Sequence, residues 1–300
     1  MFSGLVISDV HTEREKFMLR KLLGLAPKLE SDGSYSPSAI ALKLATSDTS
    51  DYKEIAYSPV NNPKRKVLVL ATEQKNMEMR NGKLFSTGNH PVETLVPMLH
   101  LRNAGYEFEI ATPTGKPAII EMWAFPQKDE HVNSIYSQYK KQLENPTSLY
   151  SLVANGLSAE DYAAVFVPGG HGAMLGLPDD QSVGSVLKWA HDNDLFTISI
   201  CHGPAAFLAT CTSDSEFLYQ GYKMAVFPDS VDAQSPMIGY LPGKMPWGLS
   251  NKLKGLGVLL ANNKADTTVC RDRLLITGAS PLAADALGKL AVETLTSSHT

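Results

Sequence analysis

The stretch KVLVLATE, residues 66–73, marks the start of the predicted core. It is a short run of apolar and β-branched residues, which is the composition of a strand buried on both faces. Helical segments separate it from several similar runs: YEFEIAT (106–112), YAAVFVPGG (162–170), LFTISI (195–200), YKMAVFPD (222–229), GVLLAN (257–262) and LLITG (274–278). Strands that alternate with helices need crossover connections. The sequence therefore predicts an α/β fold with a doubly wound, mainly parallel sheet and helices on both faces.

Two segments fall outside this alternation. Residues 1–65 are uneven and include the polar segment ESDGSYSPS and the proline-bounded SPVNNPKRK, so we interpret them as an accessory arm. Residues 116–150 carry a mixed aromatic and charged sequence, which we interpret as an insertion that packs with the arm. The predicted core is residues 66–300, and the arm and insertion would form a smaller accessory domain.

The composition is typical of a protein with a substantial buried core, since 43% of the 300 residues are hydrophobic. The net charge is −4, with 27 basic and 31 acidic residues mixed along the chain, so we expect no cationic surface for a nucleic-acid backbone. Three cysteines are an odd number for a disulfide framework, which favours a reduced compartment. No apolar stretch approaches the roughly 20 residues that span a bilayer. We therefore expect a cytoplasmic protein.

The strongest candidate for a reactive side chain is Cys201, which directly follows the predicted strand LFTISI. In an open parallel sheet, reactive groups collect beyond the carboxyl ends of the strands. Pro204 favours a helix start just after the cysteine, and a helix amino terminus lowers the pKa of a thiol. On position alone, a small buried residue at the strand end is an equally good interpretation. Cys211 and Cys270 have no comparable setting, and we interpret both as structural.

Glycines crowd the end of another predicted strand, in VFVPGGHGAMLG at residues 165–176. Gly169, Gly170 and Gly172 would let the backbone approach a ligand and turn its amides inward, as an oxyanion site requires. A simple tight turn is the alternative. The pattern is neither a dinucleotide fingerprint nor a phosphate-binding loop, so the sequence predicts no nucleotide cofactor.

Two carboxyl groups could act beside the predicted nucleophile. Glu93 lies near the start of the first core helix, in NHPVETLVP, where it could hydrogen-bond the thiol and move protons. Compensation of the helix dipole is the simpler alternative. Asp229 and Asp232 follow the strand YKMAVFPD, and a carboxylate there could orient His202 in a Cys-His-Asp arrangement. A turn aspartate that caps its own backbone is at least as common.

Six separated motifs resemble those of one known family, the DJ-1/PfpI superfamily, and within it the long heat-shock protein 31 class, also described as glyoxalase III and protein deglycase. The likeness covers roughly residues 66–300. It implies a flavodoxin-like sandwich with a smaller added domain, usually in a homodimer. The motifs are NGKLFSTGNHPVETLVP (81–97), VFVPGGHGAMLGLP (165–178), ISICHGPAAFLA (198–209), FPDSVD (227–232), IGYLPG (238–243) and LLITGASPLAADALGKLA (274–291).

The resemblance also implies roles for particular residues. Cys201 would be the nucleophile, His202 and Asp232 its triad partners, and Glu93 the acid beside the thiol. The backbone amides of Gly170 and His202 would form the oxyanion site. The implied activity is cysteine-dependent conversion of methylglyoxal or glyoxal to lactate or glycolate without glutathione, or removal of these groups from glycated protein. Nucleic acid would be a substrate only when it is glycated.

One part of the family pattern is missing. Members of this class carry a metal site of two histidines and one carboxylate, and the aligned positions here are Arg102, Glu107 and Tyr139. A guanidinium cannot bind a cation, and one carboxylate with a phenol is a poor divalent site. We therefore predict no bound metal, and stoichiometric zinc at Glu107 in the purified protein would contradict this.

Two other functions fit the family. A stress-induced holding chaperone would need an exposed apolar surface for unfolded clients rather than the thiol. A PfpI-like peptidase is permitted by the triad, but a narrow cleft beneath an added domain would exclude folded substrates. Cys201→Ala separates the classes, because it should abolish dicarbonyl turnover and spare suppression of aggregation.

Overall fold

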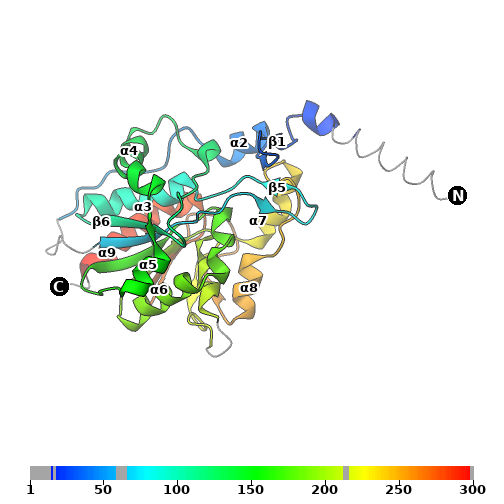
Figure 1. Cartoon of the computed structure of the whole chain (residues 1–300). Helices are drawn as coiled ribbons and strands as arrows, with labels where there is room; N and C mark the ends of the chain where they lie inside the picture. The colour runs from blue at the N-terminus through cyan, green and yellow to red at the C-terminus, as the bar shows by residue number, and fades with distance from the viewer. Residues whose placement is uncertain (1–14, 16–17, 59–65, 212–215, 298–300) are drawn as a thin grey trace.

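The structure, a computed structural model, describes residues 15, 18–58, 66–211 and 216–297. At its centre is a seven-stranded sheet in the order β12-β13-β9-β8-β3-β6-β7, in which only the β12–β13 pair is antiparallel (Figure 1). The predicted mainly parallel sheet is therefore confirmed. Its strands are β3 (Lys66–Leu70), β6 (Glu107–Thr112), β7 (Thr147–Ser148), β8 (Tyr162–Val167), β9 (Phe196–Ile200), β12 (Val269–Asp272) and β13 (Leu275–Gly278).

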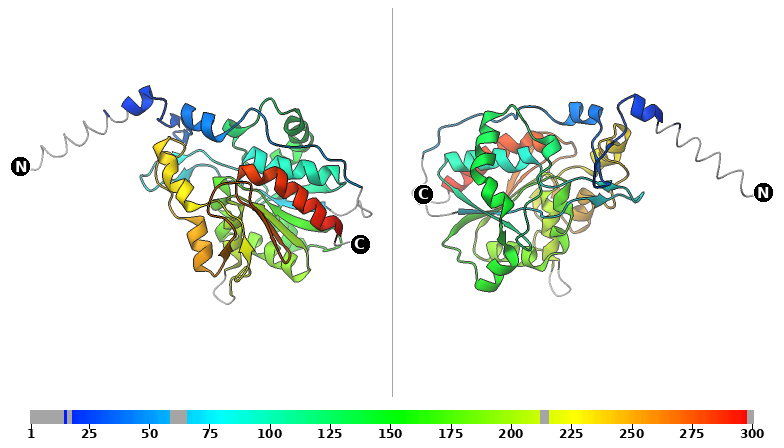
Figure 2. Two further views of the ribbon diagram at one scale, coloured as in Figure 1. Left: turned by 180° about the vertical axis from the view of Figure 1, so that it is seen from behind. Right: turned by 45° about the horizontal axis from the view of Figure 1, so that its top comes forward.

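Helices cover both faces of this sheet. Side chains alternate along β3, so Val67 and Val69 join one apolar cluster while Leu68 and Leu70 join the other. Figures 1 and 2 show α3 and α9 together on one face and α6 on the opposite face. The first face carries α3 (Pro91–Asn103), α4 (Glu130–Glu144) and α9 (Ala284–Ser297), and the second α5 (Leu149–Asn155), α6 (Gln181–Asp192) and the 3-10 helix η4 (Gly203–Thr210).

The described part of the arm adds two strands and a short helix to the edge of the core. A second sheet has the order β1-β2-β5-β4, so that arm strands pair with strands of the loop between β3 and α3. These elements are β1 (Lys28–Leu29), β2 (Tyr35–Ser36), α2 (Ala39–Ala45), β4 (Met77–Glu78) and β5 (Leu84–Phe85). The rest of the predicted arm, residues 1–14, 16–17 and 59–65, lies outside the described residues.

The arm also contacts the segment that we interpret as an insertion. The backbone N–H of Ser50 donates to Asp129 Oδ2 at 2.8 Å, and the Lys128 N–H donates to the Asp48 carbonyl at 2.8 Å. Asp129 at the same time caps α4, because its Oδ1 accepts from the Val132 N–H at 2.9 Å. These contacts support the proposal that residues 1–65 and 116–150 act together as an accessory layer.

Two predicted strands are wrong in extent and place. Only Lys223–Met224 (β10) and Leu259–Leu260 (β11) are extended, and they pair with each other outside the central sheet. Beyond Met224 the backbone bonds to side chains instead of a strand, since the Ala225 N–H donates to Thr277 Oγ1 at 2.8 Å. The segment around Cys270, by contrast, forms the antiparallel edge strand β12. Two further helices, α7 (Asp229–Gln234) and α8 (Leu249–Gly255), lie between β10 and β11 in the chain.

Candidate active site

Three connections meet at the carboxyl edge of the sheet and enclose a cavity of about 290 Å³. Cys201 follows β9 directly, Gly170 follows β8, and Glu93 lies in the first turn of α3, the helix that follows β3. All three residues line the cavity. The structure therefore brings together residues that the sequence places more than 100 positions apart.

The backbone of Cys201 adopts an unusual conformation that exposes its side chain to this cavity. Its φ is 59°, in the left-handed region that residues with a Cβ rarely occupy. Two hydrogen bonds hold it: its N–H donates to the Gly278 carbonyl at 2.8 Å, and its carbonyl accepts from the Phe227 N–H at 3.0 Å. Such a conformation costs on the order of 1–3 kcal/mol and is found mainly where function needs it. It resembles the nucleophile turn of α/β-hydrolases.

The predicted Cys-His-Asp arrangement is present as geometry. Cys201 Sγ lies 3.3 Å from His202 Nδ1, and His202 Nε2 lies 2.9 Å from Asp232 Oδ2. All three side chains are buried. With the proton on Nε2 shared with Asp232, Nδ1 is left as the acceptor that faces the thiol. Burial and the neighbouring His171 lower the pKa of His202, so the imidazole is neutral and able to act as a base.

Asp232 is shared by two histidines, which the sequence did not predict. His171 Nε2 lies 2.8 Å from Asp232 Oδ1, and the His171 and His202 rings lie with their centroids 4.0 Å apart and their planes tilted by 34°. Although burial opposes ionisation, His171 and His202 hold the pKa of Asp232 well below its usual range. Burial also opposes a charge on His171, but Asp232 outweighs it and raises the His171 pKa. The carboxylate therefore stays ionised beside one neutral and one more basic imidazole.

Glu93 is fully buried beside the thiol, and neither of its carboxyl oxygens has a hydrogen-bonding partner of good geometry. Gly169 makes this approach possible, because a Cβ there would collide with Glu93 Oε2. Burial raises the pKa of Glu93 to about 8, although the nearby Cys201 and the Gly170 N–H act in the opposite direction. Near neutral pH the carboxyl group is therefore largely protonated, which suits it to proton transfer.

The expected effect of the helix on the thiol is wrong. The segment after Cys201 is the 3-10 helix η4 rather than an α-helix, and burial together with the Glu93 charge raises the pKa of the thiol. The Gly170 N–H opposes this shift only in part. Two buried acids side by side resist a double negative charge, so near neutral pH the thiol keeps its proton and the Glu93 carboxyl group is largely protonated.

Gly170 provides the amide that faces the reacting groups. Its φ of 98° and the closeness of the Gly88 carbonyl and the His90 N–H leave no room for a Cβ. Its N–H lowers the pKa of both Cys201 and Glu93, as a donor directed at developing negative charge would. The conformation agrees with the predicted oxyanion role of Gly170.

Four further residues with titratable side chains line the same cavity, and the sequence analysis assigned no role to any of them: His90, Glu121, His171 and Tyr240. His171 directly follows the glycine pair and His90 precedes the first turn of α3, so their positions gave a usable signal. Glu121 comes from the segment interpreted as an insertion, whose position relative to the core no local pattern reveals. The arm contributes Leu44 and Ala45 to the cavity wall.

Asp229, the other aspartate considered from the sequence, has a structural role. Its carboxylate accepts from the backbone N–H groups of Ser250 and Asn251, both at 2.9 Å, at the start of α8. These bonds satisfy amides that a helix start leaves without partners. Asp229 therefore caps the start of a distant helix rather than its own turn, and Asp232 contacts His171 and His202 instead.

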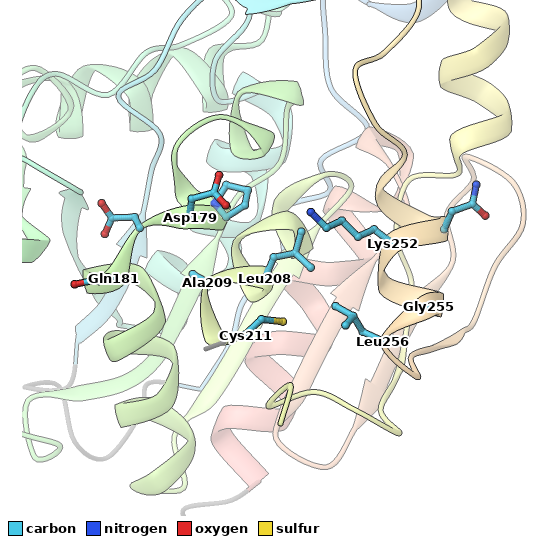
Figure 3. Close-up of a pocket in the computed structure, with 11 residues that line it drawn as sticks. Asp179, Gln181, Leu208, Ala209, Cys211, Lys252, Gly255 and Leu256 are labelled. Carbon is cyan, nitrogen blue, oxygen red and sulfur yellow. The ribbon is translucent and has the colours of Figure 1, made fainter. Parts of the chain in front are cut away.

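A larger hollow of about 810 Å³ surrounds the exposed Cys211, at the far end of η4 from Cys201 (Figure 3). Burial raises the pKa of this thiol, and the Lys252 ammonium lowers it less. Among the described residues that line the hollow there is no histidine or glutamate, and its acids are Asp179 and Asp180. This site lacks the bases that surround Cys201.

The positions of the family metal site do not fit a divalent cation. The Arg102 guanidinium donates to Gln138 Oε1 at 3.0 Å, and Tyr139 is buried edge-on against Phe108. Only Glu107 offers a suitable oxygen, and Arg102 lies near enough to affect the Tyr139 pKa. Elsewhere, His171, His202 and Asp232 bring three potential ligand atoms within 4.8 Å, but hydrogen bonds between them already use these atoms. Neither group carries a step of the chemistry below.

The fold and the site together define a class: an α/β sandwich with a buried cysteine on a turn at the carboxyl edge of its sheet. The DJ-1/PfpI family profile matches residues 84–228. The chain is 45% identical over 271 residues to the Escherichia coli O157:H7 protein named protein/nucleic acid deglycase HchA, covering 90% of this chain and 95% of that one. The chain belongs to the DJ-1/PfpI family.

Solved structures agree on the fold. Glyoxalase III from Candida albicans superimposes with a TM-score of 0.61 at 21% identity, covering 78% of this chain and 98% of that one. The 24 kDa rapid encystment protein of Francisella tularensis gives a TM-score of 0.64 at 19% identity, with 77% and 99% covered. About a fifth of the chain therefore lies outside the part that superimposes on each neighbour. No helix within the described residues has the length and apolar character needed to cross a membrane.

Proposed function

We propose that the chain is a cysteine-dependent glyoxalase III or protein deglycase that acts on methylglyoxal, glyoxal or their early adducts. The observation that carries this proposal is the buried pair of Cys201 and Glu93, which shares a small cavity with the Gly170 amide. A cavity of about 290 Å³ suits a small carbonyl compound better than a polypeptide segment. The name of the 45% identical relative, protein/nucleic acid deglycase, supports the same chemistry.

The first step is addition of the thiol to the aldehyde. The Cys201 sulfur bonds to the aldehyde carbon while the carbonyl electron pair moves onto oxygen, where the amides of Gly170 and His202 stabilise the charge. The thiol proton passes to His202, and the largely protonated Glu93 gives a proton to that oxygen, which yields a hemithioacetal and leaves Glu93 as a carboxylate. His202 is placed for this by its 3.3 Å contact with the sulfur and its 2.9 Å contact with Asp232.

The second step moves a proton between the two carbons of the substrate. A base, Glu93 or His202, removes the proton from the former aldehyde carbon, and the neighbouring ketone carbon receives one in return. The result is a thioester of lactate, which water hydrolyses to lactate and the free thiol. Overall, methylglyoxal and one water give lactate. The oxidation of one carbon balances the reduction of the other, so the step needs no external redox partner.

Deglycation differs in its first step, because the dicarbonyl is already bonded to an amine or a thiol and that bond has to break. The thiol would displace the amine or thiol of an early adduct on a protein or a glycated nucleobase, the leaving group would take up a proton, and the same hemithioacetal would result. Both activities use one thiol and one carbonyl carbon.

The test follows methylglyoxal and lactate together in a buffer free of thiols and amines. The wild-type protein should form one lactate per methylglyoxal consumed, and Cys201→Ala should lose at least about a thousandfold in turnover. Cys211→Ala is the matched control and should keep its activity. Acceleration seen only with preformed adducts would assign the protein to deglycation. Equal rates for wild type and Cys201→Ala would overturn the proposal.

A holding chaperone remains a second candidate because the described part of the arm exposes several large apolar side chains. Leu22 is 84% exposed and Leu29 61% exposed, and neither lines the cavity at Cys201. Single exposed leucines are ordinary, but a group on one segment is typical of a binding surface. Suppression of aggregation that survives Cys201→Ala and falls with Leu22→Ser would support it.

A peptidase is the weaker alternative, and casein hydrolysis as fast as dicarbonyl loss would favour it. The homodimer remains a prediction.

A further inference from the structure

Two buried side chains in the cavity at Cys201 have no part in the steps above. Glu121 is 2% exposed and His90 is 6% exposed, and each keeps one buried hydrogen-bonding atom without a partner. These atoms are Glu121 Oε2 and His90 Nδ1. Leaving a buried polar atom unsatisfied is costly, so two such atoms in one cavity indicate a ligand that satisfies them.

The Glu121 carboxyl group is held in a defined orientation. Its Oε1 accepts from the Thr87 hydroxyl at 2.6 Å and from the Gly88 N–H at 3.3 Å, which leaves Oε2 as its free atom. The Glu121 N–H donates to the Asn89 carbonyl at 3.0 Å, next to His90. The two side chains thus come from two segments, at residues 88–90 and 119–121, that are hydrogen-bonded side by side.

The segment at residues 88–90 is also hydrogen-bonded to the turn that carries the Gly170 amide. The His90 N–H donates to the Gly169 carbonyl at 2.9 Å, and the Gly172 N–H donates to the Gly88 carbonyl at 3.1 Å. The free atoms of His90 and Glu121 therefore lie at a fixed place relative to the reacting groups rather than on a mobile loop.

The charge of the cavity limits what can bind there. Three carboxyl groups line it, those of Glu93, Glu121 and Asp232, and within the described part of the chain no lysine or arginine does. Burial raises the pKa of Glu121 to about 7 and lowers the pKa of His90 to about 3, so His90 is neutral and offers a lone pair. Glu121 in its carboxylate form and neutral His90 with its proton on Nε2 therefore present acceptors to the cavity, which suit a hydrogen-bond donor better than an anionic group.

We propose that Glu121 and His90 form a subsite for the nitrogen half of the substrate, binding the N–H groups of an amine or guanidine that carries the dicarbonyl. The inference rests on the proposed function and makes nitrogen adducts, those of lysine, arginine or an exocyclic base amine, the substrates that this subsite favours. A dicarbonyl carries only carbonyl oxygens, and the sulfur that leaves a cysteine adduct has no N–H. Only nitrogen adducts bring donors to both free acceptors.

Glu121→Gln tests the subsite, because the amide keeps an oxygen for Thr87 and Gly88 but replaces the free acceptor with a donor. Values of kcat/KM are measured for free methylglyoxal and for preformed adducts of N-acetylcysteine and Nα-acetylarginine. Each adduct is in equilibrium with some free methylglyoxal. The rate on the adduct is therefore compared with the rate on free methylglyoxal at that equilibrium concentration. We expect a loss of about 10- to 100-fold on the arginine adduct and less than about threefold on the other two.

Three comparisons keep the result interpretable. Glu78→Gln changes an exposed carboxyl group and should leave all three values unchanged. Glu121→Asp retains the charge but shortens the side chain by one methylene, and it should show the same selective loss. This variant replaces Glu121→Gln as the test if the glutamine variant folds poorly. Equal losses on all substrates, or none on the arginine adduct, would overturn the subsite. If Cys201→Ala keeps its turnover, the proposed function itself fails, whatever Glu121→Gln does.

Discussion

Two cysteines stand at opposite ends of η4, and they differ in almost every respect that governs reactivity. Cys201 is 4% exposed in a cavity of about 290 Å³, whereas Cys211 is exposed beside a hollow of about 810 Å³. By access and space alone, Cys211 would be the better nucleophile. Around Cys201, however, stand a histidine at 3.3 Å and a largely protonated carboxyl group, while Lys252 is the ionisable neighbour that shifts the pKa of Cys211. The neighbours of a thiol, more than its exposure, determine what chemistry it can perform.

Removing the acidic neighbour should have the largest effect on this difference. In Glu93→Gln, no carboxyl group can give a proton to the carbonyl oxygen or move protons between the substrate carbons, and we expect kcat to fall about 10²- to 10⁴-fold. The pH profile provides a second readout. Wild-type activity should decline above about pH 8, because Glu93, whose pKa is raised to about 8, then loses the proton that it gives to the carbonyl oxygen.

The control for this prediction is Cys211→Ala, which should match wild type in both rate and pH profile. A Glu93→Gln protein with wild-type kcat, or one that keeps the alkaline decline, would show that Cys201 works without this carboxyl group. The distinction between the two thiols would then have to rest on His202 and the backbone alone.

The sequence predicted the framework of the site better than its electrostatics. Alternation of apolar strands with helices was enough to predict the sheet. Position after a strand made Cys201 and the Gly169–Gly170 turn candidates, and the family motifs then favoured a functional role for both. The direction of the thiol pKa was wrong, because it depends on burial and on Glu93, which lies 108 positions earlier in the chain. Charges contributed by distant segments leave no local pattern.

The same reason explains the residues that were overlooked or misplaced. His171 and His90 adjoin quoted motifs, yet only the fold shows that one shares Asp232 and that the other faces the cavity. Glu121 enters from an inserted segment. The strand predicted at residues 222–229 has only two residues in the structure, because the side chains of Thr277 and Asn262 accept hydrogen bonds from the backbone that follows them. A pattern of apolar residues does not encode such side-chain contacts.

The second effect in size concerns stability. The unfolded chain ionises Glu93 near pH 4.5, whereas the folded protein retains its proton until about pH 8. Between these values the unfolded state binds fewer protons, so the free energy of unfolding of the wild type falls as pH rises and levels off above pH 8. Glu93→Gln does not titrate. It should gain stability relative to wild type across this window, by on the order of 2–4 kcal/mol.

Urea unfolding at pH 5, 7 and 9 measures this gain. The two proteins should be closest at pH 5 and furthest apart at pH 9, and Glu78→Gln, with its exposed carboxyl group, should parallel wild type throughout. Parallel curves for Glu93→Gln would mean that the carboxyl group ionises in the folded protein as readily as in water, which contradicts its burial beside Cys201.

The smallest effect should come from His171, which touches Asp232 but not the thiol. Its Nε2 lies 2.8 Å from Asp232 Oδ1, and its charge lowers the pKa of His202. His171→Gln should therefore reduce kcat by about tenfold, since Asp232 loses one charge-assisted hydrogen bond, and leave KM nearly unchanged. Lys252→Gln, beside Cys211, is the matched control and should change neither value.

A pH profile separates positioning by His171 from a simple loss of structure. Without the neighbouring charge, the pKa of His202 should rise, and the acidic limb of kcat/KM, which reports the neutral base, should move to higher pH. A variant that is merely less well folded would lose activity at every pH and keep that limb in place. A shift in the limb would therefore extend the functional neighbourhood of Cys201 to a second imidazole, while an unmoved limb would restrict it to His202, Asp232 and Glu93.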